Sequence, residues 1–403
     1  MDFAVHYTPE QERFRHEVRD WLDVNVVPGL GEHPEHDEPV EIYRQRRQLG
    51  RRLGERGWLY PLGDRQYGGG GLTLDATLVL IEEMQRVGLS LPPYYDSGGV
   101  IGSVAIQVWG TEEQKQAFLP KIYSGEQRTW QLLTEPGAGS DVAAASTQAV
   151  RHGDGYRITG EKVFIGSANG ADALWTLVRT GDAAARHQNL SWFMIDADAP
   201  GITITPMRLI GGTDKNSVHF DNVDVPALNL VGGENQGWTV ATTHLELEHG
   251  LRIDNLIGQR LERYWEALLV QWQKRVASSP VPPSPIARDL LVQAYVRKEV
   301  VRLLGVRNFW LSSGAEELTY EGPQAYFMEK TTTQWLAHAM MDLLGTGAVV
   351  DADGSQASAL IASAQAGSIY EMHGGGTAEI QKMIMARRLG LGRRQVERSG
   401  RLR

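Results

Sequence analysis

The feature that most constrains the fold is a change of residue pattern near Gln127 that reverses near Val231. Before the first point, apolar residues recur at helical spacing. Between the two points, short runs of strand-forming residues alternate with turn signals, which is typical of a small barrel or sandwich. Helical spacing then returns. We therefore predict an α+β protein with a helical domain over residues 1–126, a β domain over 127–232 and a second helical domain over 233–403.

Local signals mark where the predicted elements begin. Thr8–Gln11 combines a cap residue, a proline at the first helical position and a glutamine three residues after the cap. Thr111 precedes two acids and predicts another helix start. Gly153–Gly155 predicts a hairpin turn. The expected strands include Tyr156–Thr159, Leu174–Val178, Trp192–Ile195, Ile202–Thr205 and Ser217–Phe220.

Composition excludes several classes of protein. The 403 residues are 42% hydrophobic and 22% charged, as in an ordinary globular chain of more than one domain. The net charge is −9 without a basic stripe, so nucleic acid is not an expected partner. There is no cysteine, no signal-peptide pattern and no apolar run long enough to span a bilayer, so a cytoplasmic protein is expected. His244 and His249 lack the i,i+4 spacing of a helical metal pair, and no metal site is expected.

The segment Leu133–Asp141 is rich in turn-forming residues. Pro136 fixes its own φ, and the glycines of the segment open backbone conformations that other residues resist. Thr134 and Ser140 supply hydroxyls beside free backbone N–H groups. Such a loop could hold a polar, partly anionic ligand, or it could be an ordinary surface turn. The loop by itself leaves both interpretations open.

Together with stretches elsewhere in the chain, this loop resembles the most recognisable segment of the acyl-CoA dehydrogenase family, and in particular of bacterial FadE-like flavoproteins. The other matching stretches are Gly110–Lys115, Gly155–Lys162, Val231–Trp238, Gly375–Gln381 and Ala386–Leu391. The resemblance implies a C-terminal four-helix bundle, FAD between the β domain and that bundle, and a dimer or tetramer whose neighbouring subunit also touches FAD. The implied reaction is α,β-dehydrogenation of an acyl-CoA, with electron-transfer flavoprotein as electron acceptor.

The resemblance also assigns cofactor contacts. The residues implied to bind FAD are Leu133, Thr134, Gly139, Ser140, Phe164, Gly166, Arg275, Gly345, Thr377 and Glu379. Phe164 takes the position of an aromatic residue that packs on the flavin ring; without the resemblance it would be read as a core aromatic in a strand. Gly166 stands where relatives often carry a hydroxyl near flavin N5, so either Ser167 compensates or that hydrogen bond is missing.

The implied chemistry needs a carboxylate to remove the α proton and hydrogen-bond donors to polarise the thioester carbonyl. Many relatives carry this glutamate directly before the Gly-Thr of the C-terminal loop. Here that position is Gly375, and Glu371 lies about one helical turn too early. Other subgroups, such as isovaleryl-CoA dehydrogenase, place the base on the long helix after the β domain. In that register Glu248 is the base, and the alternative is that Glu248 is a solvated helical acid.

The remaining substrate contacts follow from the same register. Ser140, Glu246, His249 and Gly375 are implied to lie beside the substrate. His249 replaces an arginine that is common in relatives, and Glu246 and Glu248 diverge on a helix because they are two residues apart.

Three rival interpretations remain. The chain could be a non-catalytic flavin-binding or structural subunit of a heteromeric dehydrogenase. The altered family motifs near Arg275 and Gly345 leave open a partner that is a different chain. It could be a flavin oxidase or oxygenase of the same fold, or it could act on an acyl group carried by a carrier protein. A homodimer, a homotetramer and a heterotetramer with a related subunit all stay open.

Overall fold

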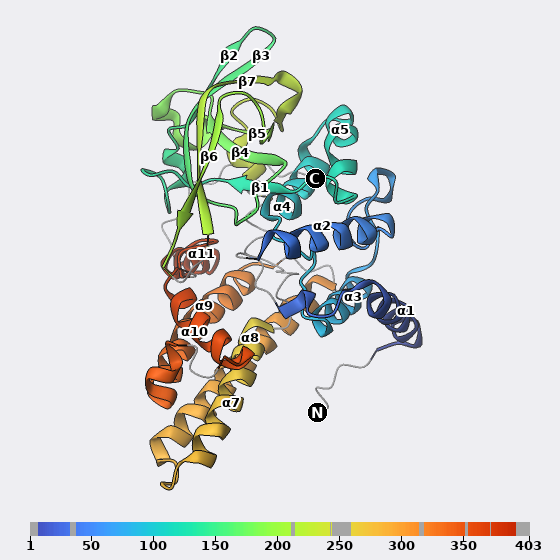
Figure 1. The fold of residues 1–403 in the computed structure, drawn as a ribbon. Helices are drawn as coiled ribbons and strands as arrows, with labels where there is room; N and C mark the ends of the chain where they lie inside the picture. Colours follow the sequence, from blue (N-terminus) through green and yellow to red (C-terminus); the bar gives the residue numbers. More distant parts are fainter. Residues whose placement is uncertain are drawn as a thin grey trace. The chain divides into compact units, whose positions relative to one another are not determined.

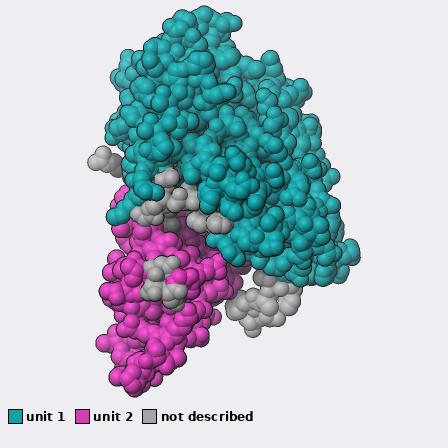
Figure 2. Space-filling view, in the orientation of Figure 1, with its two compact units in different colours: residues 1–247 teal, residues 248–403 magenta. Residues whose placement is uncertain are grey.

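The computed structural model describes residues 7–32, 38–210, 214–241, 243, 259–313, 318–350, 354–370 and 372–391. The chain forms two compact units, residues 1–247 and residues 248–403, which Figure 2 colours separately. In the part of the chain that is described, no helix has the length and apolar character needed to cross a membrane.

The first unit begins with helices. They are α1 (Pro9–Asn25), α2 (Val40–Glu55), α3 (Leu74–Arg86), α4 (Ser97–Trp109) and α5 (Glu112–Tyr123), with the short 3-10 helices η1 (Leu30–Glu32) and η2 (Arg65–Tyr67). Both predicted helix starts are confirmed. Thr8 and Gln11 form a reciprocal capping box at α1, and Thr111 and Gln114 form another at α5.

The sheet follows in the same unit. Its strands are β1 (Thr129–Leu132), β2 (Gln148–His152), β3 (Gly155–Ile165), β4 (Ala173–Arg179), β5 (Leu190–Asp196), β6 (Ile202–Arg208), β7 (Asp214–Pro226) and β8 (Leu230–Val231). The order in the eight-stranded sheet is β6-β7-β3-β2-β4-β5-β8, and β1 pairs with β4 in parallel (Figure 1). Each expected strand lies inside one of these elements, and the Gly153–Gly155 turn joins β2 to β3.

Strand β3 is the element that matters for the site. It pairs along its length with β7, and the register between them shifts twice, the second time between Lys162 and Ile165. Such irregularities re-aim side chains near the end of a strand. The core beneath the sheet contains Trp130, Phe193 and Phe220, all fully buried.

The second unit is helical. Its described helices are α7 (Gln259–Ser278), α8 (Pro285–Ser313), α9 (Glu321–Leu344), α10 (Gln356–Tyr370) and α11 (Ala378–Arg388), and a 3-10 turn, η7 (Gly345–Ala348), follows α9. Leu268, Met340 and Ile361 meet in its apolar core, which joins α7, α9 and α10. The predicted class, helices followed by a β region and then helices, is confirmed.

Candidate functional site

The loop after β1 is a tight turn with an open rim. Glu135 and Ala138 exchange backbone hydrogen bonds, both of 3.1 Å, across Pro136 and Gly137. The rim beyond the turn is exposed, and no heavy atom lies within 4 Å of a Cβ built on Gly139. The loop therefore presents backbone and hydroxyl groups to its surroundings rather than packing them into the sheet.

The base of the loop is bonded to strand β3. Lys162 Nζ donates to the carbonyl oxygen of Leu133 at 3.1 Å and to Glu135 Oε1 at 2.7 Å. Val163 N donates to the carbonyl oxygen of Thr134 at 2.9 Å. The side chains of Glu135 and Lys162 are 1% and 0% exposed. Residues about thirty positions apart in sequence are thus fixed against one another.

Phe164 has an unusual backbone and an unusual environment. Its φ is +62°, which is uncommon for a bulky residue and costs about 1–3 kcal/mol unless the surroundings impose it. The residue is 53% exposed, although it lies within β3. A core role for this ring is therefore excluded. An exposed aromatic ring on a strained backbone is a candidate ligand contact.

Side chains of β7 hold the turn that follows. Lys215 Nζ donates to the carbonyl oxygen of Gly166 at 2.6 Å. Asn216 Nδ2 donates to the carbonyl oxygens of Ile165 and Ser167, both at 3.0 Å. These bonds hold the backbone carbonyls of the three residues that follow Phe164.

Gly166 and Ser167 face the interior of the unit. Gly166 has φ +62°, and a Cβ at this position would overlap the ring of Trp130. Ser167 is 1% exposed, and its Oγ accepts a hydrogen bond of 2.7 Å from Arg128 Nη2. The Ser167 hydroxyl is therefore engaged in a buried contact with Arg128.

The second unit also has a loop with predicted site residues, which lies directly before α11. Thr377 caps that helix, since its Oγ1 accepts from Ile380 N at 3.2 Å, and Glu379 is exposed in the first turn. Gln381 Nε2 donates to the carbonyl oxygen of Gly375 at 3.0 Å. Lys330 Nζ, from α9, donates to the carbonyl oxygen of Gly374 at 2.6 Å.

A side chain at Gly375 would meet both backbone strain and the side chain of Tyr326. The φ of Gly375 is +62°, in the left-handed region that favours glycine, and a Cβ would overlap the hydroxyl oxygen of Tyr326. That hydroxyl also donates to the carbonyl oxygen of Gly374 at 3.2 Å. The Tyr326 hydroxyl of α9 therefore lies where a side chain at position 375 would begin.

Arg275 and Gly345 meet at the carboxyl end of α9. Arg275 Nη1 donates to the carbonyl oxygen of Leu344 at 2.9 Å, and Gly345 follows with φ +64°. Arg275 and Gly345 are both among the FAD contacts that the resemblance implies, and the family motifs near them are altered.

The structure brings predicted site residues together at three places, each within one unit. Leu133, Thr134, Phe164 and Gly166 meet where the loop joins β3, and Gly139 and Ser140 lie on the exposed part of the same loop. In the second unit, Arg275 and Gly345 meet at the carboxyl end of α9. Gly375 and Thr377 lie in the separate loop that is bonded to side chains from the first half of α9. Glu246, Glu248, His249 and Glu371 lie outside the described residues, so their roles stay predictions.

Sequence reasoning gave no role to Glu135 and Lys162, although both lie in the matched stretches. The signal was available, because Lys162 is a charged residue in an otherwise apolar run, Lys162–Ile165. A charge at such a place needs a partner when it is buried.

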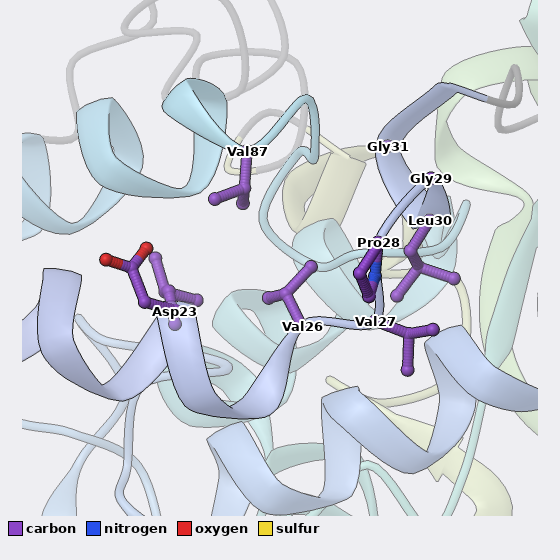
Figure 3. A pocket seen from close by; sticks show the side chains of 9 residues that line it. Asp23, Val26, Val27, Pro28, Gly29, Leu30, Gly31 and Val87 are labelled. Atoms are coloured by element: carbon purple, nitrogen blue, oxygen red, sulfur yellow. The ribbon is translucent and has the colours of Figure 1, made fainter.

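The cavity in Figure 3 has a volume of about 340 Å³ and lies elsewhere, against the helices of the first unit. Its lining residues are Leu22, Asp23, Val26, Val27, Pro28, Gly29, Leu30, Gly31 and Val87. No predicted site residue lines it.

Comparison with known proteins identifies the class. Residues 8–126 match the N-terminal domain of acyl-CoA dehydrogenases, residues 131–223 match the middle domain and residues 235–390 match the C-terminal domain. A full-length relative, the acyl-CoA dehydrogenase IpdE1 of Mycobacterium tuberculosis (strain ATCC 25618 / H37Rv), is 30% identical over 95% of this chain and 98% of its own. The chain belongs to the acyl-CoA dehydrogenase family, whose members are flavoprotein oxidoreductases.

Solved structures share the fold. The Tcur3481-Tcur3483 steroid ACAD superposes with a TM-score of 0.81 at 28% identity, covering 98% of this chain and 100% of the other. The ChsE4-ChsE5 complex of Mycobacterium tuberculosis superposes with a TM-score of 0.79 at 26% identity, covering 97% and 100%.

The described residues fit the flavin that the family uses. An exposed aromatic ring, Phe164, offers a stacking surface beside the loop that carries the Thr134 hydroxyl. The glycine rim at Gly139 leaves space for close approach to backbone N–H groups.

Proposed function

We propose that this protein is an FAD-dependent acyl-CoA dehydrogenase that converts an acyl-CoA into a 2-enoyl-CoA. The observation that carries the proposal is Phe164, an exposed aromatic ring held at φ +62° next to the bonded base of the Thr134 loop. Bound FAD would supply the acceptor for the hydride that leaves the β carbon.

The chain's own residues divide into two sets of cofactor contacts. In the first unit, Thr134 and Ser140 would offer hydroxyls, Leu133 and Gly139 would offer backbone groups, and Phe164 would pack on the flavin ring. In the second unit, the proposed contacts to the pyrophosphate and adenosine parts are Arg275, Gly345, Thr377 and Glu379. The proximity of Arg275 to the end of α9 and the exposure of Glu379 support this assignment.

Glu248 is the proposed base for the α proton. The support is that position 375, which holds the base in the register of many relatives, is a glycine and supplies no carboxylate. Glu246 and His249 would flank the substrate on the same segment. A base in an apolar pocket has a raised pKa, which favours proton transfer near neutral pH.

The test is bleaching of bound FAD by a panel of acyl-CoAs under anaerobic conditions. Wild-type protein should lose flavin absorbance with at least one acyl-CoA, and Glu248→Gln should slow that reduction by at least about 10³-fold while it retains FAD. Glu266→Gln, an acid of α7 for which we propose no role at the site, is the control and should reduce FAD at the wild-type rate.

The other outcomes separate the rivals. FAD that binds but is reduced by no thioester would favour a non-catalytic subunit. Oxygen consumption that survives Glu248→Ala would favour an oxidase. Reduction only by acyl carrier protein derivatives would change the substrate class.

The relatives guide the choice of substrates and partners. Because one structural relative is a steroid ACAD, the panel should include acyl-CoAs with steroid side chains or rings. Because another is a complex of two chains, ChsE4 and ChsE5, the protein should also be assayed with a related chain co-expressed. We propose electron-transfer flavoprotein as the electron acceptor, to be tested by its reduction in the presence of substrate.

A further inference from the structure

We propose that the buried Glu135–Lys162 pair is a positioning device that sets the Thr134 loop against Phe164 and so shapes the flavin cradle. This inference rests on the proposed FAD binding, and it assigns a role to residues that make no direct contact with the cofactor in the proposal.

The geometry points to a junction rather than an isolated ion pair. Lys162 bonds to Leu133 and Glu135, the residues on either side of Thr134, while Val163 bonds to Thr134 itself. Phe164 is the next residue of the strand. The backbone of Thr134 therefore has its position fixed relative to the backbone that carries the exposed ring.

Glu135 also ties the loop to the segment that leads into β2. It accepts hydrogen bonds from Ser146 N and Ser146 Oγ, both at 2.6 Å, and from Thr147 N at 3.1 Å. Thr147 Oγ1 in turn donates to the carbonyl oxygen of Glu161. The carboxylate thus joins three segments, namely the loop, the start of β2 and strand β3.

A positioning role is assigned because Glu135 and Lys162 form a buried ion pair, which stability alone does not explain. Burying an ion pair is seldom more stabilising than burying apolar residues of the same volume, so stability alone does not explain this one. Burial by itself raises the pKa of Glu135, but Lys162 and the Ser146 hydrogen bonds outweigh it and lower the pKa to about 2. The carboxylate is therefore ionised at neutral pH.

Outside this junction, the described contacts of the Leu133–Asp141 loop include no other buried ion pair. Pro136, Gly137, Gly139 and Ser140 are exposed, and the ion pair at the other end, Arg186–Asp141, has side chains that are 51% and 57% exposed. Exposed pairs contribute little to order or stability. The position of the Thr134 hydroxyl accordingly depends on the buried junction.

The experiment compares Glu135→Gln/Lys162→Met with a matched control, Arg157→Gln/Asp224→Asn. The control removes an ion pair that joins β3, the strand of Lys162, to β7, with N–O distances of 2.8 and 2.9 Å. This pair is more exposed than Glu135–Lys162 and lies outside the loop. Apo-protein is titrated with FAD, and the thermal transition of the apo-protein and the visible circular dichroism of the bound flavin are recorded.

We expect the neutral double variant to fold and to bind FAD at least about tenfold more weakly, with altered flavin dichroism. The control should keep the wild-type Kd and spectrum. Each single change, which strands one buried charge, should lower the thermal transition more than the double change. A folded double variant with a Kd within twofold of wild type and the same dichroism would overturn the inference.

If the double variant does not fold, Lys162→Arg tests whether the Glu135–Lys162 pair positions the Thr134 loop. Arginine keeps the charge but changes the geometry of the donor. Unchanged flavin dichroism and Kd in this variant would refute a positioning role, whereas a shifted spectrum with an intact thermal transition supports it. If wild-type apo-protein fails to bind FAD, the proposed function is wrong and the positioning inference falls with it.

Discussion

At the scale of single residues, backbone conformation limits the chemistry of the C-terminal loop. The left-handed conformation of Gly375 and the nearby Tyr326 hydroxyl disfavour a side chain at this position. Gly374, one residue earlier, has open space around a built Cβ and no positive φ. The backbone therefore favours glycine at position 375, whereas position 374 has space for a side chain.

This difference predicts that alanine destabilises the protein more at Gly375 than at Gly374. Gly375→Ala should destabilise the protein by about 1–3 kcal/mol, because it adds backbone strain and an overlap with Tyr326. Gly374→Ala should change stability by less than about 0.5 kcal/mol. Urea unfolding of both variants measures the difference. Adding Tyr326→Phe to Gly375→Ala should recover part of the loss, and equal effects of the two alanines would contradict the interpretation.

At the scale of elements, the first helices are joined by a cluster of charges. Glu83 of α3 is 2% exposed and binds Arg15 and Arg19 of α1 together with Arg86 of its own helix. Burial by itself raises the pKa of Glu83, but the hydrogen bonds from Arg19, Arg86 and Arg15 outweigh it and lower the pKa to about 2.

A pH dependence of stability follows from this lowered pKa. The stabilisation from Glu83 should be fully present above its ordinary value near 4.5 and be lost as the pH falls toward 2. Glu83→Gln should therefore cost about 2–3 kcal/mol at pH 7, and the gap between variant and wild type should narrow below pH 4.5. Denaturant unfolding across pH 2–7 checks this.

Glu17→Gln is the control for that measurement, since the exposed Glu17–Arg56 pair should contribute less than about 1 kcal/mol at any pH. A gap for Glu83→Gln that stays constant with pH would mean that the arginines do not act through the ionised carboxylate.

At the scale of the whole molecule, the proposed FAD contacts fall in both compact units. The loop Leu133–Asp141 and the end of β3 belong to residues 1–247, whereas Arg275, Gly345 and Thr377 belong to residues 248–403. A ligand that binds only the folded protein stabilises every segment it contacts.

Hydrogen exchange with and without FAD tests this distribution. FAD at about 100 times its Kd should stabilise the native state by about 2.7 kcal/mol and slow exchange in both the Leu133–Asp141 loop and the 372–377 loop. The segment from Val26 to Gly31, which lines the cavity in the first unit and includes no proposed contact, is the internal reference. If FAD slows exchange in only one unit, the FAD contacts proposed in the other unit are wrong.

Much of the architecture followed from local sequence. The caps at Thr8 and Thr111, the Gly153–Gly155 turn and the alternation of strand runs with turns predicted the order of elements, because these features depend on residues close together in the chain. The family motifs also predicted which residues contact FAD, and that assignment stays a prediction. Glu248 lies outside the described residues and remains a prediction from the sequence.

Other features were decided only by the tertiary structure. The exposure of Phe164, its left-handed backbone, the Glu135–Lys162 junction and the overlap between Gly375 and Tyr326 all depend on segments that are distant in sequence. Sequence periodicity reports which face of an element is apolar, but it does not report which distant backbone or side chain lies against a given residue. The sequence by itself thus determined the elements and the family, and folding decided which groups of the cradle are fixed, buried or exposed.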